Sequence, residues 1–200
     1  MKTRKSDLSD AMIASHLGLA ELRLGRHSST SEDLTGEHDF WVQSIWRARP
    51  LPAFDADAFI AVVTCAEPWQ PRINPHPGFW QRCKQHLRGQ SMPRVVASRK
   101  ALISLQDEAT VVELPYDPVA TALREVDLFE TYEYESLDGI GYWFDVETWN
   151  LRASFSFGNP EVPSLQRLAK AVLAVGHEIA QISGSGPVAE YLKVWSRYAA

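Results

Sequence analysis

The sequence contains few cysteines and no long apolar run. The two cysteines among the 200 residues, Cys65 and Cys83, are too few for a disulfide framework, and their spacing fits no zinc-site pattern. The longest stretches without charge or proline, such as residues 59–66, are far shorter than the roughly 20 apolar residues of a transmembrane helix. The first residues after Met1 are largely charged and do not form the apolar segment of a secretory signal peptide. We therefore expect a cytoplasmic protein that does not enter a membrane.

Motifs of common enzyme classes are also missing. His177 begins a segment similar to the zinc motif His-Glu-x-x-His, but position 181 is glutamine, so the second imidazole is absent. The glycine-rich segments lack the lysine and the strand–helix context of a phosphate-binding loop, and no G-x-S-x-G hydrolase motif occurs. We therefore assign no catalytic residue, no metal and no cofactor from the sequence.

One segment of the chain lacks acids and another lacks bases. Residues 72–100 hold seven Lys or Arg and no acid, whereas residues 125–151 hold eight acids and no Lys or Arg. The formal net charge of the chain is −5. Residues 101–200 have a net charge of −9, because they hold 6 basic and 15 acidic residues. The two blocks could face one another in the fold, where exposed pairs contribute about 0–1 kcal/mol each. Alternatively, one of them points outward and steers an oppositely charged partner.

The first half of the chain gives a mixed pattern. We favour a helix that is capped by Ser6 or Ser9 and ends near Leu24, although its leucines also fit a strand. We expect a mobile polar loop at about 26–38. Apolar residues at helical spacing predict a short helix over 40–49, and β-branched residues predict a buried strand over 59–65. Pro77 predicts the start of a helix that ends at Gly89.

The second half indicates strands followed by helices. Short strands are predicted over 94–98, 101–105 and 109–114, and Asp117 is expected to cap a helix that runs to about Asp127. Apolar residues follow the helical period from Leu165 to Ala180. A break at residues 183–186 then separates this helix from a final one over 188–195, which predicts an αα-hairpin.

The Asp138-Gly139 dipeptide predicts a two-residue β-hairpin turn between strands 129–137 and 140–148. That register pairs Tyr134 with Trp143, and a further strand is expected over 151–157. We expect Phe144 and Val146 to face the core, and the alternation of the further strand places Leu151, Ala153, Phe155 and Phe157 on its core side. The outward face then carries aromatic and acidic side chains, namely Glu130, Tyr132, Tyr134, Trp143, Asp145 and Glu147.

These elements predict a single α+β domain over residues 1–200. Its antiparallel sheet is expected to be a meander of about five to six strands, covered by helices and followed by the C-terminal αα-hairpin.

The outward aromatic and acidic face of the predicted hairpin has the composition of a protein interface. We therefore expect a non-enzymatic protein that binds a basic protein partner, for example an immunity protein that neutralises a bacterial toxin. One alternative is a hydrolase or transferase with a pocket between residues 72–100 and the carboxylates of Asp145 and Glu147. Another is nucleic-acid binding through residues 72–100, which the sequence pI of about 5.7 disfavours.

Overall fold

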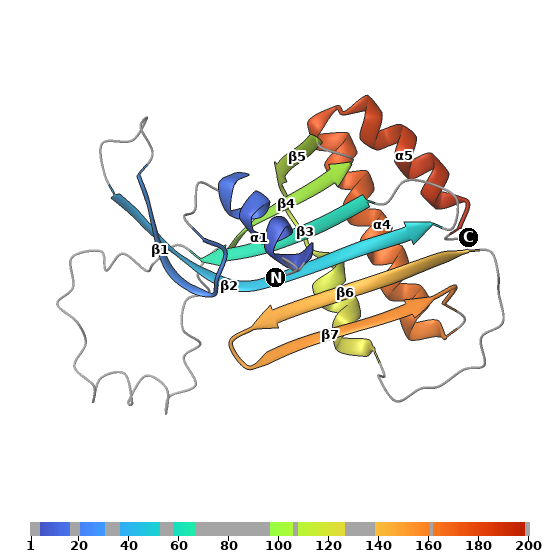
Figure 1. The fold of residues 1–200 in the computed structure, drawn as a ribbon, viewed down its shortest axis with the longest axis horizontal. Coiled ribbons are helices and arrows are strands. Elements are labelled where there is room, and N and C mark those ends of the chain that lie inside the picture. The colour runs from blue at the N-terminus through green and yellow to red at the C-terminus, as the bar shows by residue number, and fades with distance from the viewer. Residues whose placement is uncertain are drawn as a thin grey trace.

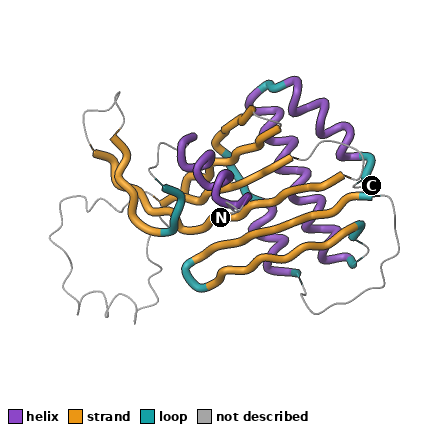
Figure 2. The backbone as a smooth tube through the Cα atoms, viewed as in Figure 1, coloured by secondary structure: helices purple, strands orange, loops and turns teal. Residues whose placement is uncertain are grey.

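The computed structural model describes residues 5–16, 21–30, 37–52, 58–66, 97–105, 108–126, 139–160 and 162–198. Its described strands form one antiparallel sheet with helices on both faces, as Figures 1 and 2 show. The predicted α+β class with an antiparallel sheet is confirmed, as is the pair of C-terminal helices.

The described elements have the following bounds in chain order: α1 (Lys5–His16), β1 (Gly25–Thr30), β2 (Glu37–Pro52), β3 (Ala58–Ala66), β4 (Ala97–Leu105), β5 (Glu108–Glu113), α3 (Pro118–Ala122), the 3-10 turn η1 (Leu123–Glu125), β6 (Ile140–Thr148), β7 (Leu151–Gly158), α4 (Pro163–Ser183) and α5 (Gly186–Ser196).

Strand β2 organises the sheet, whose order is β5-β4-β3-β2-β6-β7 with β1 also paired to β2. Val42 pairs with Gly25 of β1 and with Cys65 of β3. Strand β1 therefore lies on the edge of β2 that β6 occupies further along, from Ser44 to Pro52. The two ends of this long strand thus hold different neighbours on the same edge.

Two apolar cores lie on opposite faces of the sheet. Helices α4 and α5 cover one face, where the buried stripe of α4, including Leu168 and Val172, packs on strand residues such as Phe144. Helix α1 crosses the other face, where Ile13 packs with Val42 and Ile45 of β2. The helical period that predicted α4 is confirmed because its apolar residues are the ones that this core buries.

Asp117 joins β2 to the helix side of the fold. As expected, its carboxylate caps α3 by accepting from the backbone N–H groups of Val119 and Ala120 (3.0 and 3.2 Å). Its second oxygen accepts from the indole Nε1 of Trp46 (2.8 Å). The helix is shorter than predicted, since α3 ends at Ala122 and the 3-10 turn η1 follows it.

The predicted helix over 40–49 is wrong, because this segment is the middle of β2. A β-bulge between Val42 and Ser44 inserts one extra residue, so Val42 and Ile45 face the same core although they are three residues apart. A spacing of three is also the signature of a helix. The bulge therefore reproduced a helical pattern within a strand.

Other boundaries also differ from the prediction. The expected loop at 26–38 is replaced by β1 and the start of β2, with residues 31–36 outside the described part. Helix α1 ends at His16 rather than near Leu24, and one strand, β4, replaces the two predicted over 94–98 and 101–105. The predicted helix from Pro77 to Gly89 lies outside the described residues.

The predicted pairing of 129–137 with β6 is also wrong. Both edges of β6 are occupied, by β2 over its whole length and by β7 from Gly141 to Thr148. The two-residue hairpin turn is instead Trp149-Asn150, with Thr148 paired to Leu151. The strand that actually pairs with β6 in place of 129–137 is distant in sequence, and a local turn rule cannot identify it.

Candidate functional site

The sheet face opposite α4 and α5 is polar over β2, β6 and β7. The register aligns Arg47 with Asp145 and Ser154, and it aligns Arg49 with Trp143 and Ser156. Because opposed residues of antiparallel strands share a face, these rows form one surface. We call it the polar face; it consists of Arg47, Arg49, Trp143, Asp145, Glu147, Arg152, Ser154 and Ser156.

A buried ion-pair network lies in this polar face, beneath the start of α1. The Arg47 side chain is 3% exposed, its Nε donates to Asp10 Oδ1 (2.7 Å), and its Nη1 donates to Asp145 Oδ2 (2.8 Å). The second oxygen of Asp145 accepts from Ser154 Oγ (2.6 Å). Both carboxylate oxygens of Asp145 therefore have donors, and the network connects α1, β2, β6 and β7.

This network changes the interpretation of the predicted site residues. Asp145 is buried and paired, so the expectation that it faces solvent is wrong. Trp143 and Glu147 lie on the same face and are half-buried. Glu130, Tyr132 and Tyr134 lie outside the described residues.

The inward assignment is confirmed for Phe144 and Val146, which are buried in the core beneath α4, and for Phe155, which packs against it. It is wrong for Leu151, which is 56% exposed at the start of β7. The pairing of Asp145 with Arg47 was missed because Arg47 belongs to the segment that was predicted to be a helix.

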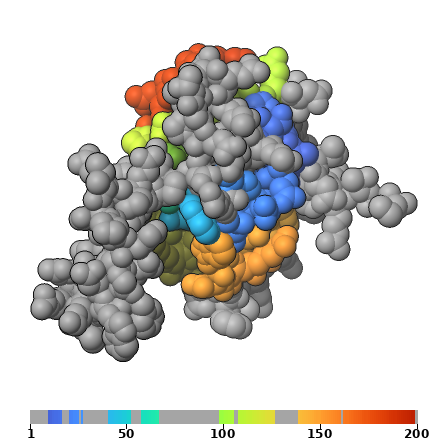
Figure 3. All heavy atoms as spheres, turned by 90° about the vertical axis from the view of Figure 1, so that its left-hand side faces the viewer, coloured from blue at the N-terminus to red at the C-terminus, as the bar shows by residue number. Residues whose placement is uncertain are grey.

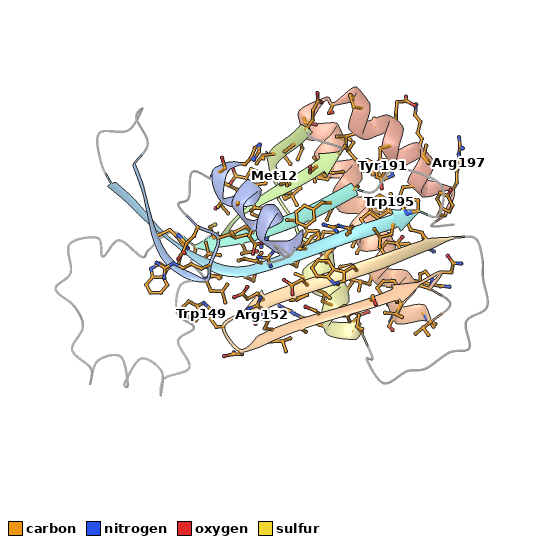
Figure 4. All side chains as sticks on the ribbon, in the orientation of Figure 1. Met12, Trp149, Arg152, Tyr191, Trp195 and Arg197 are labelled. Carbon is orange, nitrogen blue, oxygen red and sulfur yellow. The ribbon has the colours of Figure 1, made fainter. Side chains whose placement is uncertain are left out.

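Two exposed tryptophans meet at the end of the β6–β7 hairpin. Trp149 is 59% exposed and Trp41 is 41% exposed, and their ring centroids are 6.2 Å apart with a 45° interplanar angle. Figure 4 labels Trp149 at the hairpin turn, and Figure 3 shows this end of the molecule beside the segment that leads into β1. We call these two residues the tryptophan pair.

Sequence reasoning also missed the tryptophan pair. Trp149 belongs to a two-residue turn between strands, a position that is normally solvent-facing. Trp41 is brought to it only by the pairing of β2 with β6, which places Ser44 opposite Thr148. The predicted strands over 140–148 and 151–157 already place Trp149-Asn150 between them, but the contact with Trp41 could not be predicted from the sequence.

The structure describes only part of the pocket predicted between residues 72–100 and the carboxylates of Asp145 and Glu147. Asp145 is paired with Arg47, and residues 72–96 lie outside the described part. Burial raises the pKa of the Cys65 thiol, partly offset by nearby Lys100, so this group stays protonated at neutral pH. His177 is exposed on α4. Within the described ranges, no group of three or more His, Cys, Asp or Glu is placed to hold a metal ion.

None of the described helices combines the length and the apolar composition that a membrane crossing requires. Comparison with known proteins gives no further assignment, because no family model, no curated protein and no solved structure matches this chain.

Proposed function

We propose that this protein is a non-enzymatic binding module that docks another protein at the tryptophan pair. The observation that carries the proposal is the exposure of Trp41 and Trp149 in contact with one another at the end of the sheet. Tryptophan supplies a large, rigid contact area and is enriched among the residues that dominate binding energy.

The acidic charge of the chain is suited to a basic partner at the tryptophan pair. Glu147 lies two residues from Trp149, on the half-buried row of the polar face next to Arg152. The chain carries a formal net charge of −5, and residues 101–200 contribute −9. A basic protein would therefore be attracted over long range before the tryptophans make contact.

One form of this function is inhibition of a basic toxin by covering its active site. An acidic module with exposed aromatic anchors could occlude such a site without any chemistry of its own. We place this activity in the cytoplasm, because the chain has only two cysteines and the described one, Cys65, is free and buried.

The proposal is tested by Trp149→Ala, because the variant removes the more exposed ring. Tyr116→Ala is a matched control, since Tyr116 is also 59% exposed and belongs to the loop before α3. Wild type and both variants are used as bait in extracts of the source organism. The partner is the protein that wild type and Tyr116→Ala retain and Trp149→Ala loses.

With that partner purified, calorimetry should show that Trp149→Ala weakens binding by about 2 kcal/mol or more. The affinity of the wild type should fall as salt is raised, because salt screens the attraction between an acidic and a basic protein. If no retained protein depends on Trp149, the tryptophan pair is not a docking site. If binding is insensitive to salt, the partner is not a basic protein.

A further inference from the structure

Trp149 lies against the ladder that β1 forms with β2. It belongs to the two-residue turn between β6 and β7, and more than half of its surface faces solvent. One neighbour of its ring is Trp41 of β2, the other member of the tryptophan pair. The far edge of the ring points at Gly25 of β1, where a Cβ atom would lie 3.9 Å from Trp149 Cη2. The ring is therefore placed by two strands that are distant from it in sequence.

Gly25 is the residue of β1 over which this ring lies. It is buried, begins the strand and pairs with Val42 of β2. Its φ of +118° is strained for any residue with a side chain, so the position favours glycine. Apart from the chain neighbours of Gly25, Trp149 is the one described residue within 4 Å of the Cβ position. A methyl group would make ordinary contact there, but a longer side chain would enter the space that the ring occupies.

The fixed position of the ring bears on its role in docking. A side chain that must be ordered when a partner arrives loses conformational entropy, and this loss lowers the affinity. A ring that already lies against Trp41 and over β1 avoids part of that loss. The residue that leaves room for this arrangement therefore contributes to binding without touching the partner.

We propose that Gly25 is a positioning residue of the tryptophan pair. Because it has no side chain, the Trp149 indole can lie over the start of β1 and against Trp41. Gly25 is buried, so it acts through Trp149 and not by contact with the partner. This inference rests on the proposed function, since it concerns how the same docking site is prepared before the partner binds.

The first test is circular dichroism of the full chain and needs no partner. Two indoles in contact couple their electronic transitions and give a pair of bands of opposite sign, and the difference between wild type and Trp149→Phe isolates this pair. Gly25→Leu should abolish the two bands, because its side chain extends into the position of the ring. Gly25→Ala should retain them, because a methyl group fits and the backbone strain is similar.

Gly184→Leu is the control for a leucine at positive φ. Gly184 follows α4 with a φ of +67°, and nothing lies within 4 Å of its Cβ position. This variant should retain the two bands. If Gly25→Leu also retains them, Gly25 does not position the ring and the proposal is overturned. If Gly25→Ala loses them as completely as Gly25→Leu, the backbone of β1 is responsible and the space above Gly25 is not, which also overturns it.

A double-mutant cycle covers the case in which Gly25→Leu folds poorly. The variant should lower the urea midpoint of unfolding, partly through backbone strain and partly through its clash with the ring. In a Trp149→Ala background the clash is absent, so the shift of the midpoint should be roughly halved. An equal shift in both backgrounds means that Gly25 does not act through Trp149, and it overturns the proposal.

Binding separates this inference from the proposed function. With the partner that depends on Trp149, Gly25→Leu should weaken the affinity about tenfold and Gly184→Leu should leave it unchanged. If Gly25→Leu binds that partner like wild type, the positioning role is wrong and the proposed function is unaffected. If no partner depends on Trp149, the proposed function is wrong and Gly25 has no role in docking, whereas the circular dichroism still shows whether Gly25 positions the ring.

Discussion

Arg47 and Asp145 form the most deeply buried ion pair among the described residues. A buried charge that loses its partner is strongly destabilising, because its desolvation is no longer compensated. We therefore expect Asp145→Ala to lower the free energy of unfolding by about 3 kcal/mol, measured by urea denaturation.

Asp10→Ala is the matched variant, since it removes the other carboxylate on the same guanidinium. The Asp10 side chain is 36% exposed, so water can replace it and the expected loss is about 1 kcal/mol or less. If the two variants lose the same free energy of unfolding, the deeper burial of Asp145 does not make its ion pair with Arg47 more important for stability than that of Asp10.

Tyr142 is a second residue whose contribution can be isolated. Its hydroxyl accepts from the indole Nε1 of Trp195 (3.0 Å) inside the core, and burial raises its pKa from 10.0 to about 12, although the Trp195 bond opposes the shift. The folded state thus favours the neutral phenol. Its stabilising contribution is complete below pH 10 and is lost as the pH rises from 10 to about 12, by about 3 kcal/mol in total.

The measurement compares the pH dependence of unfolding of the wild type with that of Tyr142→Phe. The variant cannot ionise, so its stability should fall less steeply between pH 10 and 12. It should also be less stable at neutral pH by about 1–3 kcal/mol, because the Trp195 N–H loses its acceptor. Parallel curves for the two proteins would show that another group is responsible for the alkaline loss.

At the scale of elements, the β2 bulge makes an unusual prediction. Gln43 is the extra residue, and it is exposed. Deleting it makes the strand regular while Val42 and Ile45 remain on the same face, since they are then two positions apart. We expect the Gln43 deletion to fold with a loss of about 1 kcal/mol or less, measured by circular dichroism and urea denaturation.

Deletion of Ala48, in the regular part of β2, provides the contrast. It reverses the faces of all residues on one side of the deletion, so apolar and charged side chains exchange positions. We expect this protein not to fold. If the Gln43 deletion were as damaging as the Ala48 deletion, the bulge would be essential to the sheet rather than an accommodated insertion.

The β6–β7 hairpin shows that local sequence patterns can locate a strand but cannot identify the strands that pair with it. The sequence predicted the strands that became β6 and β7, and Phe144 and Val146, which were assigned to the core side, are buried there. It did not identify the neighbours of β6. Gly139 has the positive φ (148°) that its Asp-Gly context suggested, but it leads into Ile140, whose N–H donates to the side chain of Asn159.

At the scale of the whole molecule, β2 connects the two cores. Its residues on one face contribute Trp46 and Ala48 to the core beneath α4, and those on the other contribute Val42 and Ile45 to the core beneath α1. A strand buried on both faces has no polar–apolar alternation. Strand β3 is also buried on both faces and was predicted, so the physical reason that β2 was taken for a helix is its bulge, which gives Val42 and Ile45 a helical spacing.

Local sequence signals were sufficient to predict the α+β class, the buried strand β3, the long amphipathic helix α4 and the cap at Asp117. Each of these follows from local periodicity or from the hydrogen-bonding chemistry of one side chain. The order of the strands, the burial of Asp145 by Arg47 and the contact of Trp41 with Trp149 were decided by tertiary structure. They join residues 98 and 108 positions apart in sequence, and such pairings depend on packing between elements that no local pattern encodes.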